Sequence, residues 1–169
     1  MVKVGIPRGL LYYYYGEIWR EFLQQLGAEV IVSGETTPET IRRGGLVDEV
    51  CLPVKAAVGH VYELKDKVDL IFLPRVISMA PGQYSCPNII GLPDIVRNCI
   101  EDLPQLLVVD FNLRNSRLSL YRSVASVGRE LGQGLFPSLK AWRRACAAVG
   151  KNGQADDSPV VSRPRVALL

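Results

Sequence analysis

A strand, a helix and a second strand follow one another within the first 32 residues, and this unit constrains the fold more than any other feature of the sequence. Residues 2–6 read VKVGI, a short apolar run that ends at Pro7. The expected helix carries apolar side chains at helical spacing and ends at Gly27, before a second strand over 28–32. Because a strand–helix–strand crossover is right-handed and joins parallel strands, the unit predicts a parallel sheet.

The same alternation continues along the chain. The next expected elements are a short helix with Thr37 as its N-cap and Pro38 in its first turn, a strand around 49–52, a helix over about 55–65 and a strand over 70–73. Residues 74–92 are expected to form a long irregular connection, and such a connection in a compact domain is usually functional.

Three further elements are expected beyond this connection. They are a helix opened by Pro93, a strand over 106–109 and a helical segment over about 116–149 that Gly132, Gly134 and Pro137 interrupt. Five strands with intervening helices predict an α/β fold with a doubly wound, mostly parallel sheet of the Rossmann or flavodoxin type.

The sequence after residue 150 changes character. Residues 1–150 form the expected α/β domain, and 151–164 are polar and rich in turn-forming residues, as in a linker. Residues 165–169 read RVALL, a new strand signal that resembles the one at residues 2–6. We expect this segment to begin a second, truncated α/β domain. The alternative is that it adds an edge strand to the first domain.

Composition excludes several classes of protein. The chain has 169 residues, of which 48% are hydrophobic and 22% charged, as in a globular domain with a core of its own. A net charge of +3 without a dense basic face argues against nucleic-acid binding. No apolar run approaches the roughly 20 residues of a membrane span, and no signal peptide is visible. We therefore expect a cytoplasmic protein that binds no membrane.

Two of the four cysteines lie in proline-containing segments that are expected to be irregular. Cys51 lies in DEVCLPVK and Cys86 in YSCPNIIGLPD, each near the expected carboxyl end of a strand, where open α/β sheets bind ligands. The amides and dipole of a following helix favour the thiolate that binds iron. The two cysteines do not form a CxxC motif and cannot complete a four-iron cluster. Residue types alone therefore favour free structural thiols, with metal binding as the alternative.

The other two cysteines and a run of tyrosines have a simpler interpretation. Cys99 and Cys146 fall on apolar stripes of expected helices, where cysteine is usually a small core residue. The run over 12–15 reads YYYY and could either line a site or pack the first helix against the sheet.

Several motifs in a fixed order carry a family resemblance. They are GIPRGLLYYYY at 5–15, CLPVK at 51–55 followed by Gly59-His60, LPR at 73–75, and Cys86-Pro87 followed by GLPD at 91–94. Together they resemble the acyl-CoA dehydratase activase-related family, which is similar to the subunits of 2-hydroxyglutaryl-CoA dehydratase. The likeness runs from Val2 to about Asp110 and resumes in the last strand.

The resemblance implies an iron–sulphur protein. Cys51 and Cys86 match positions that would supply two thiolates of a [4Fe-4S] cluster, and at least one further ligand would come from the missing C-terminal domain. The cluster would therefore be incomplete or absent in this chain alone. Lys55, His60 and Arg75 could position the cluster or offset the charge of the cluster or of CoA phosphates. Structural or surface roles are the alternative for these three residues.

The same resemblance implies a function in anaerobic metabolism. It would be ATP-driven, low-potential electron transfer or the radical dehydration of an acyl-CoA, with a separate ATP-dependent activase as electron donor. The chain itself lacks a GxxxxGK[ST] phosphate-binding loop. Two alternatives remain: a binding or scaffold domain without a cluster, and a domain with a catalytic thiol for which His60 would serve as base.

Overall fold

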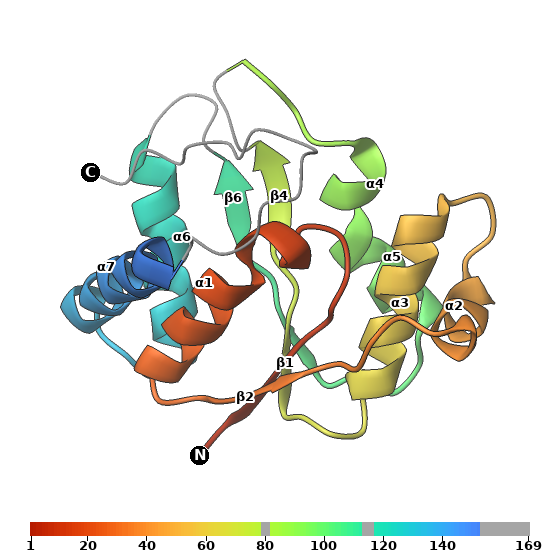
Figure 1. Cartoon of the computed structure of the whole chain (residues 1–169), viewed down its shortest axis with the longest axis horizontal. Coiled ribbons are helices and arrows are strands. Elements are labelled where there is room, and N and C mark those ends of the chain that lie inside the picture. Colours follow the sequence, from red (N-terminus) through yellow and green to blue (C-terminus); the bar gives the residue numbers. More distant parts are fainter. Residues whose placement is uncertain (79–81, 113–116, 153–169) are drawn as a thin grey trace.

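Four parallel strands form the central sheet, in the order β2–β1–β3–β5 (Figure 1). The computed structural model describes residues 1–78, 82–112 and 117–152. The strands of this sheet are β1 (Lys3–Ile6), β2 (Glu29–Val32), β3 (Leu70–Phe72) and β5 (Gln105–Leu107). This strand order is that of a doubly wound sheet, in which the chain builds outward from β1 in both directions.

A second pair of parallel strands, β4 (Arg75–Ser78) and β6 (Asp110–Asn112), prolongs the sheet at its carboxyl edge. The amide of Leu73 donates to the carbonyl of Leu107 at 3.1 Å, and the amide of Arg75 donates to that of Val109 at 2.9 Å. Hydrogen bonds therefore continue from the first pair of strands into the second. Pro74 lies at the junction and has no amide hydrogen to donate.

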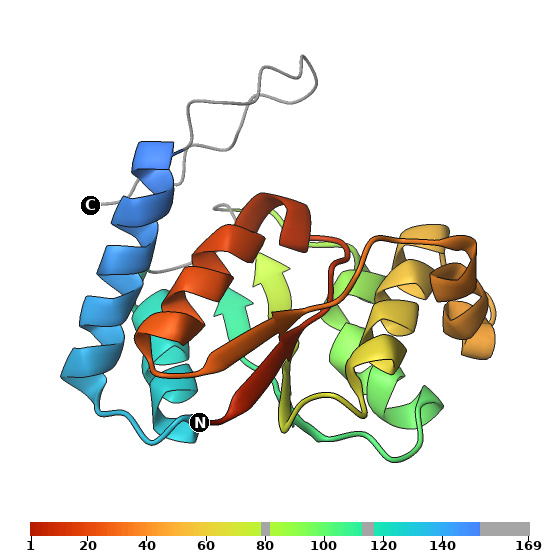
Figure 2. The same ribbon diagram turned by 60° about the horizontal axis from the view of Figure 1, so that its bottom comes forward.

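Helices cover both faces of the sheet, as Figure 2 shows. One face carries α1 (Tyr12–Gln25), α6 (Arg117–Glu130) and α7 (Leu135–Asn152). The other carries α2 (Pro38–Arg43), the short 3-10 helix η1 (Gly44–Leu46), α3 (Leu52–Leu64), α4 (Pro87–Ile90) and α5 (Leu92–Cys99). The architecture is thus a three-layer α/β fold of the Rossmann or flavodoxin type, as the sequence predicted.

The sheet separates two hydrophobic cores. Val4, Ile6 and Phe72 pack against α1, α6 and α7. Ile71 and Leu73, which alternate with Phe72 along the chain, pack against α3 and α5. Strands buried on both faces are apolar at consecutive positions, which explains the continuous runs in the sequence.

Two local predictions are confirmed in detail. Gly27 follows α1 with a φ of +88°, a left-handed conformation that glycine adopts without steric cost. Thr37 caps α2, because its hydroxyl accepts a hydrogen bond from the amide of Thr40 while the Thr40 hydroxyl accepts one from the amide of Thr37.

Two predicted elements are wrong, and a third is confirmed. Residues 49–52 form no strand. Glu49 has a φ of +59°, and Cys51 already occupies the N-cap position of α3, which begins at Leu52. The connection over 74–92 is not irregular throughout, since it contains β4 and α4. The segment over 116–149 is helical and interrupted near Gly132 and Gly134 as expected, where a turn with Gly132 at a φ of +72° separates α6 from α7.

The domain boundaries can be followed only in part. Helix α7 extends to Asn152, two residues into the predicted linker over 151–164. The rest of that linker and the predicted strand over 165–169 lie outside the described residues. The second domain therefore stays a prediction.

Candidate functional site

Cys51 and Cys86 both lie at the carboxyl edge of the sheet. Helix α3 connects β2 to β3, so it runs antiparallel to the strands and begins at this edge; α4 follows β4 at the same edge (Figure 1). Cys51 is the N-cap of α3, Cys86 is the N-cap of α4, and both side chains are exposed. This edge is where open α/β sheets bind their ligands.

The thiols contribute nothing to the helices that they precede. The carbonyl of Cys51 accepts hydrogen bonds from the amides of Val54 and Lys55, but neither cysteine side chain forms a capping bond. Ser, Thr, Asp or Asn at an N-cap would stabilise a helix by about 1 kcal/mol relative to a residue that cannot cap. The local fold therefore gives no reason for cysteine at either position.

Two thiols meet only part of the requirement of an iron–sulphur cluster. A four-iron cluster is held by four cysteine thiolates. Among the residues that the structure describes, no three His, Cys, Asp or Glu side chains are grouped so that they could hold a metal ion. The assignment of Cys51 and Cys86 as ligands stays a prediction, and the remaining ligands of such a cluster would have to come from outside the described residues.

The other two cysteines are core residues, as the sequence predicted. Cys146 is buried, and burial raises the pKa of its thiol to about 11. Cys99, at the end of α5, is half-buried and packs against the core between the sheet and α3.

His60 is fully buried in the middle of α3 and serves the packing of that helix. Its Nε2 is 2.9 Å from the hydroxyl of Thr36, so its partner is a side chain. Its Nδ1 has no hydrogen-bond partner among the described residues, and burial lowers the pKa of the imidazole. His60 follows Cys51 by nine residues, a rise of about 13.5 Å along an α-helix, which places it out of reach as a base for that thiol.

Arg75 and Lys55 occupy different settings near the edge. The guanidinium of Arg75 donates to Asp94 at 2.8 Å, and its Nε lies 3.7 Å from the carboxylate of Asp110, its cross-strand neighbour. Arg75 thus links β4, α5 and β6 while remaining partly exposed. Lys55 is half-buried in the first turns of α3 and forms no ion pair within the described part of the chain. Their predicted roles toward a cofactor stay predictions.

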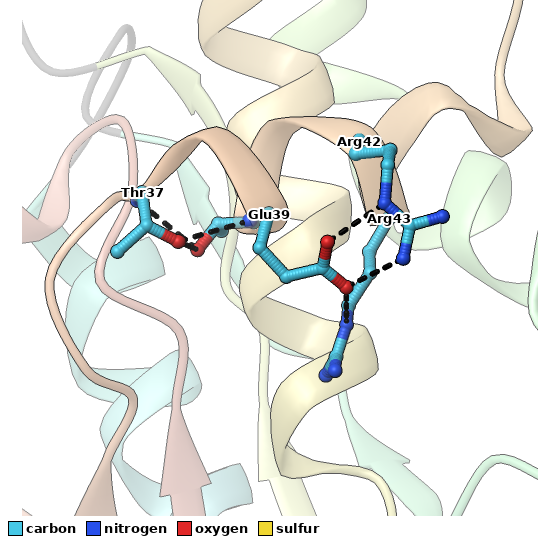
Figure 3. A network of polar contacts seen from close by, with 5 residues as sticks. Thr37, Glu39, Arg42 and Arg43 are labelled. Carbon is cyan, nitrogen blue, oxygen red and sulfur yellow. Dashed lines mark hydrogen bonds and ion pairs between the residues drawn. The ribbon is translucent and has the colours of Figure 1, made fainter.

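A polar cluster on α2 stabilises the helix and provides no site. Glu39 accepts hydrogen bonds from the guanidinium groups of Arg42 and Arg43 at 2.7–2.8 Å, next to the reciprocal cap of Thr37 (Figure 3). These hydrogen bonds lower the pKa of Glu39 to about 2. The group is exposed, and Glu39 lies in the first turn of the helix, where a carboxylate also interacts favourably with the helix dipole.

Two of the four tyrosines have the predicted packing role. Tyr12 and Tyr15 pack against the core, and the ring of Tyr15 lies 6.0 Å from that of Trp19. Tyr13 and Tyr14 are 63% and 60% exposed.

An apolar pocket at the same edge is the feature that the sequence did not reveal. It lies where the strand order reverses, between the carboxyl ends of β1 and β3, and is lined by residues from the strands, from the loop after β1 and from α1, α3, α4 and α5. Its wall includes Ile6, Leu10, Trp19, Ala57, Phe72 and Ile89. The one available signal was the pair of leucines in PRGLL directly after the first strand.

Comparison with known families shows which family the chain belongs to. Residues 3–156 match the family described as CoA enzyme activase uncharacterised domain. The chain belongs to this family. A comparison with curated proteins found no match. No helix within the described residues is long and apolar enough to cross a membrane.

Proposed function

We propose that this chain is the part of a CoA enzyme activase-related protein that contributes two thiolates, those of Cys51 and Cys86, to an iron–sulphur cluster. The observation that carries the proposal is the placement of two exposed cysteines at helix starts on one edge of the sheet. Their thiols neither cap the helices nor pack in a core, and membership of an activase-related family supports a role in CoA-linked redox chemistry.

A bound [4Fe-4S] cluster would supply one-electron transfer at low potential, which suits the removal of water from a 2-hydroxyacyl-CoA because the β-proton is otherwise too weakly acidic. The residues of this chain would hold two sulphur atoms at fixed positions. Helix α3 is well suited to this task, because its body is buried and its first residues are anchored by backbone bonds to the carbonyl of Cys51.

Further partners complete the proposal. The remaining cluster ligands would come from a second α/β domain after the linker over 151–164. A separate ATP-dependent activase would donate the electron, and an acyl-CoA would be the substrate of the assembled enzyme. Lys55 lies in α3, which begins at this edge, and Arg75 lies in β4, which ends there. Both would offset negative charge at the edge.

The decisive experiment measures iron, acid-labile sulphide and the visible spectrum of the native-length protein after anaerobic reconstitution. We expect stoichiometric iron and sulphide in the wild type and a loss of more than half in both Cys51→Ala and Cys86→Ala. Cys99→Ala and Cys146→Ala are the matched controls and should retain the cluster, because these thiols belong to the core.

The competing function is a binding or scaffold domain without redox chemistry. The absence of a third ligand among the described residues is the observation in its favour. A colourless wild type, with iron unchanged in all four cysteine variants, would establish that alternative and refute the cluster.

A further inference from the structure

We propose that the outer surface of helices α6 and α7 is the docking site for an acidic surface of a partner protein. The inference does not depend on the proposed cluster, because Cys51 and Cys86 begin helices that cover the opposite face of the sheet. It rests on the charge of the two helices, on the lack of ion pairs there and on the residue types that are exposed.

The small net charge of the chain conceals a separation of charge. Helices α6 and α7 contain seven basic residues and a single acidic residue, Glu130. Residues 1–112 contain ten basic and fourteen acidic residues. The two helices pack against each other and lie side by side at one end of the molecule (Figures 1 and 2). Positive charge is therefore gathered in one part of a domain whose remainder is net negative.

Helical spacing aligns the basic side chains on the exposed sides of both helices. Arg122 and Arg129 are seven residues apart on α6, which is about two turns. Lys140, Arg143 and Arg144 are three and four residues apart on α7, which also places them on one side. All five side chains are exposed, and together they form the basic face. The opposite sides of the two helices are buried in the core and include Val124, Val127, Ala141 and Ala145.

The charges of the basic face are not compensated by the domain. Within the described part of the chain, none of its five side chains forms an ion pair, whereas seven of the ten basic residues in 1–112 do. Lys140 and Arg144, four residues apart, repel each other and so disfavour the helix that carries them. Carboxylates brought from outside would relieve this repulsion.

The residue types on the basic face indicate a protein as the partner. Phe136 precedes Lys140 by four residues, so it lies on the same side of α7, and it is 82% exposed. Leu118 extends the α6 side in the same way and is 64% exposed. Protein interfaces are enriched in arginine and aromatic residues and depleted in lysine, and four of the five basic residues here are arginines. Arginine also binds carboxylates through two parallel hydrogen bonds.

Two other negatively charged partners fit this surface less well. A nucleic acid would continue past the two helices onto a remainder with more acidic than basic residues, which would repel its phosphates. A membrane surface binds helices whose apolar side is free to enter the lipid, but the apolar sides of α6 and α7 are used in the core. An acidic protein surface is the partner that satisfies both the charge and the exposed side chains.

The test is a binding titration of the full chain with a fluorescent peptide in which phenylalanines interrupt a run of glutamates. The same peptide with glutamine in place of glutamate is the control. We expect saturable binding of the acidic peptide, at least tenfold tighter than that of the control and weaker as the salt concentration rises. Tighter binding of a single-stranded oligonucleotide of equal charge, or of phosphatidylserine vesicles, would overturn the choice of partner.

Two pairs of charge reversals with the same effect on net charge locate the binding site. The pair Arg122→Glu and Arg143→Glu alters the basic face, and the pair Arg42→Glu and Arg97→Glu alters helices on the opposite face of the sheet. We expect the first pair to weaken peptide binding at least tenfold and the second less than twofold. Equal losses would mean that total charge, and not this face, attracts the peptide.

A single substitution tests the aromatic contact and keeps the proposal open to refutation if the first pair does not fold. Phe136→Ala removes a side chain that the core does not use and should weaken binding of the acidic peptide about fivefold. Leu46→Ala is the control, because Leu46 is also exposed but belongs to η1 on the opposite face of the sheet. Unchanged binding in Phe136→Ala, or equal losses in both variants, would contradict the assignment.

Discussion

The body of α3 and the edge at which this helix begins use their residues in opposite ways. From Val54 to Leu64 the helix buries seven side chains or glycines, and α2 and η1 pack on it so closely that Gly44 and Gly59 touch backbone carbonyls. At its start, Cys51, Leu52 and Pro53 are all exposed. One helix therefore contains both a tightly packed segment and a segment for which the described structure offers no packing partner.

This contrast separates residues whose identity packing explains from residues whose identity it does not. His60 looks functional in the sequence because it is the only histidine, but its burial and its bond to Thr36 account for it. Cys51 also stands out in the sequence, but unlike His60 it has no contact within the described residues that requires its side chain. Function is therefore best sought at the edge, among residues that the domain itself does not use.

The largest expected effect tests how tightly the α2–α3 region is packed. A β-carbon at residue 44 would lie 1.8 Å from the carbonyl oxygen of Lys55, so Gly44→Ala must push η1 away from α3. We expect a loss of about 3 kcal/mol in the free energy of unfolding, measured by urea denaturation.

Gly45→Ala is the control, since no atom lies within 4 Å of the added β-carbon. We expect a change within about 0.5 kcal/mol for this neighbouring residue. Equal destabilisation by both variants would mean that helix propensity, rather than the close contact with α3, governs this segment.

The second expected effect concerns thiol reactivity and contrasts the edge with the core directly. Cys51 and Cys86 are exposed and should react with a thiol reagent in a fast phase of two equivalents at pH 7.5. Cys146 should react on the order of 100-fold more slowly, because it is buried and its pKa is raised to about 11.

Single substitutions assign the fast phase. Cys51→Ser and Cys86→Ser should each remove one fast equivalent, and Cys146→Ser should remove none. A fast phase that keeps both equivalents in Cys51→Ser and in Cys86→Ser would place the reactive thiols elsewhere and would remove the contrast between edge and core.

The sequence predicted the layers of this fold because local patterns determine them. The unit over residues 2–32, the cap at Thr37 and the strand over 70–73 each depend on neighbours in the chain, and the structure confirms them. The predicted strand around 49–52 failed because EVCL carries a strand-like composition, whereas Glu49 adopts a left-handed turn and Pro53 favours the start of a helix.

The candidate site was predictable only in its residue types. Cysteine beside proline marked Cys51 and Cys86, and the fold then placed both at one edge of the sheet. The pocket could not be foreseen, because its wall combines side chains from six stretches of the sequence between residues 6 and 92. The partner of His60 was equally hidden, since Thr36 lies 24 residues earlier in a loop.

The smallest expected effect is a pH dependence of stability that originates in the packed body of α3. Burial lowers the pKa of His60 in the folded protein, and Arg8 lowers it further while Glu63 raises it. The unfolded chain, with a histidine pKa near 6.5, therefore binds the proton first as the pH falls. Stability from this residue is complete above about pH 7 and declines as the pH drops through 6.5 toward the folded pKa, with a slope of at most about 1.4 kcal/mol per pH unit.

Urea denaturation of the wild type and His60→Gln between pH 7.5 and 5.5 isolates this contribution. Glutamine does not titrate but can still bond the hydroxyl of Thr36, so the variant should show a flatter pH profile whatever its absolute stability. Glu63 does not disturb the comparison, because its lowered pKa places its titration below this window. Parallel profiles would mean that His60 gains a proton as readily in the folded as in the unfolded chain. The α2–α3 region would then admit water, and its contrast with the open edge would be one of degree.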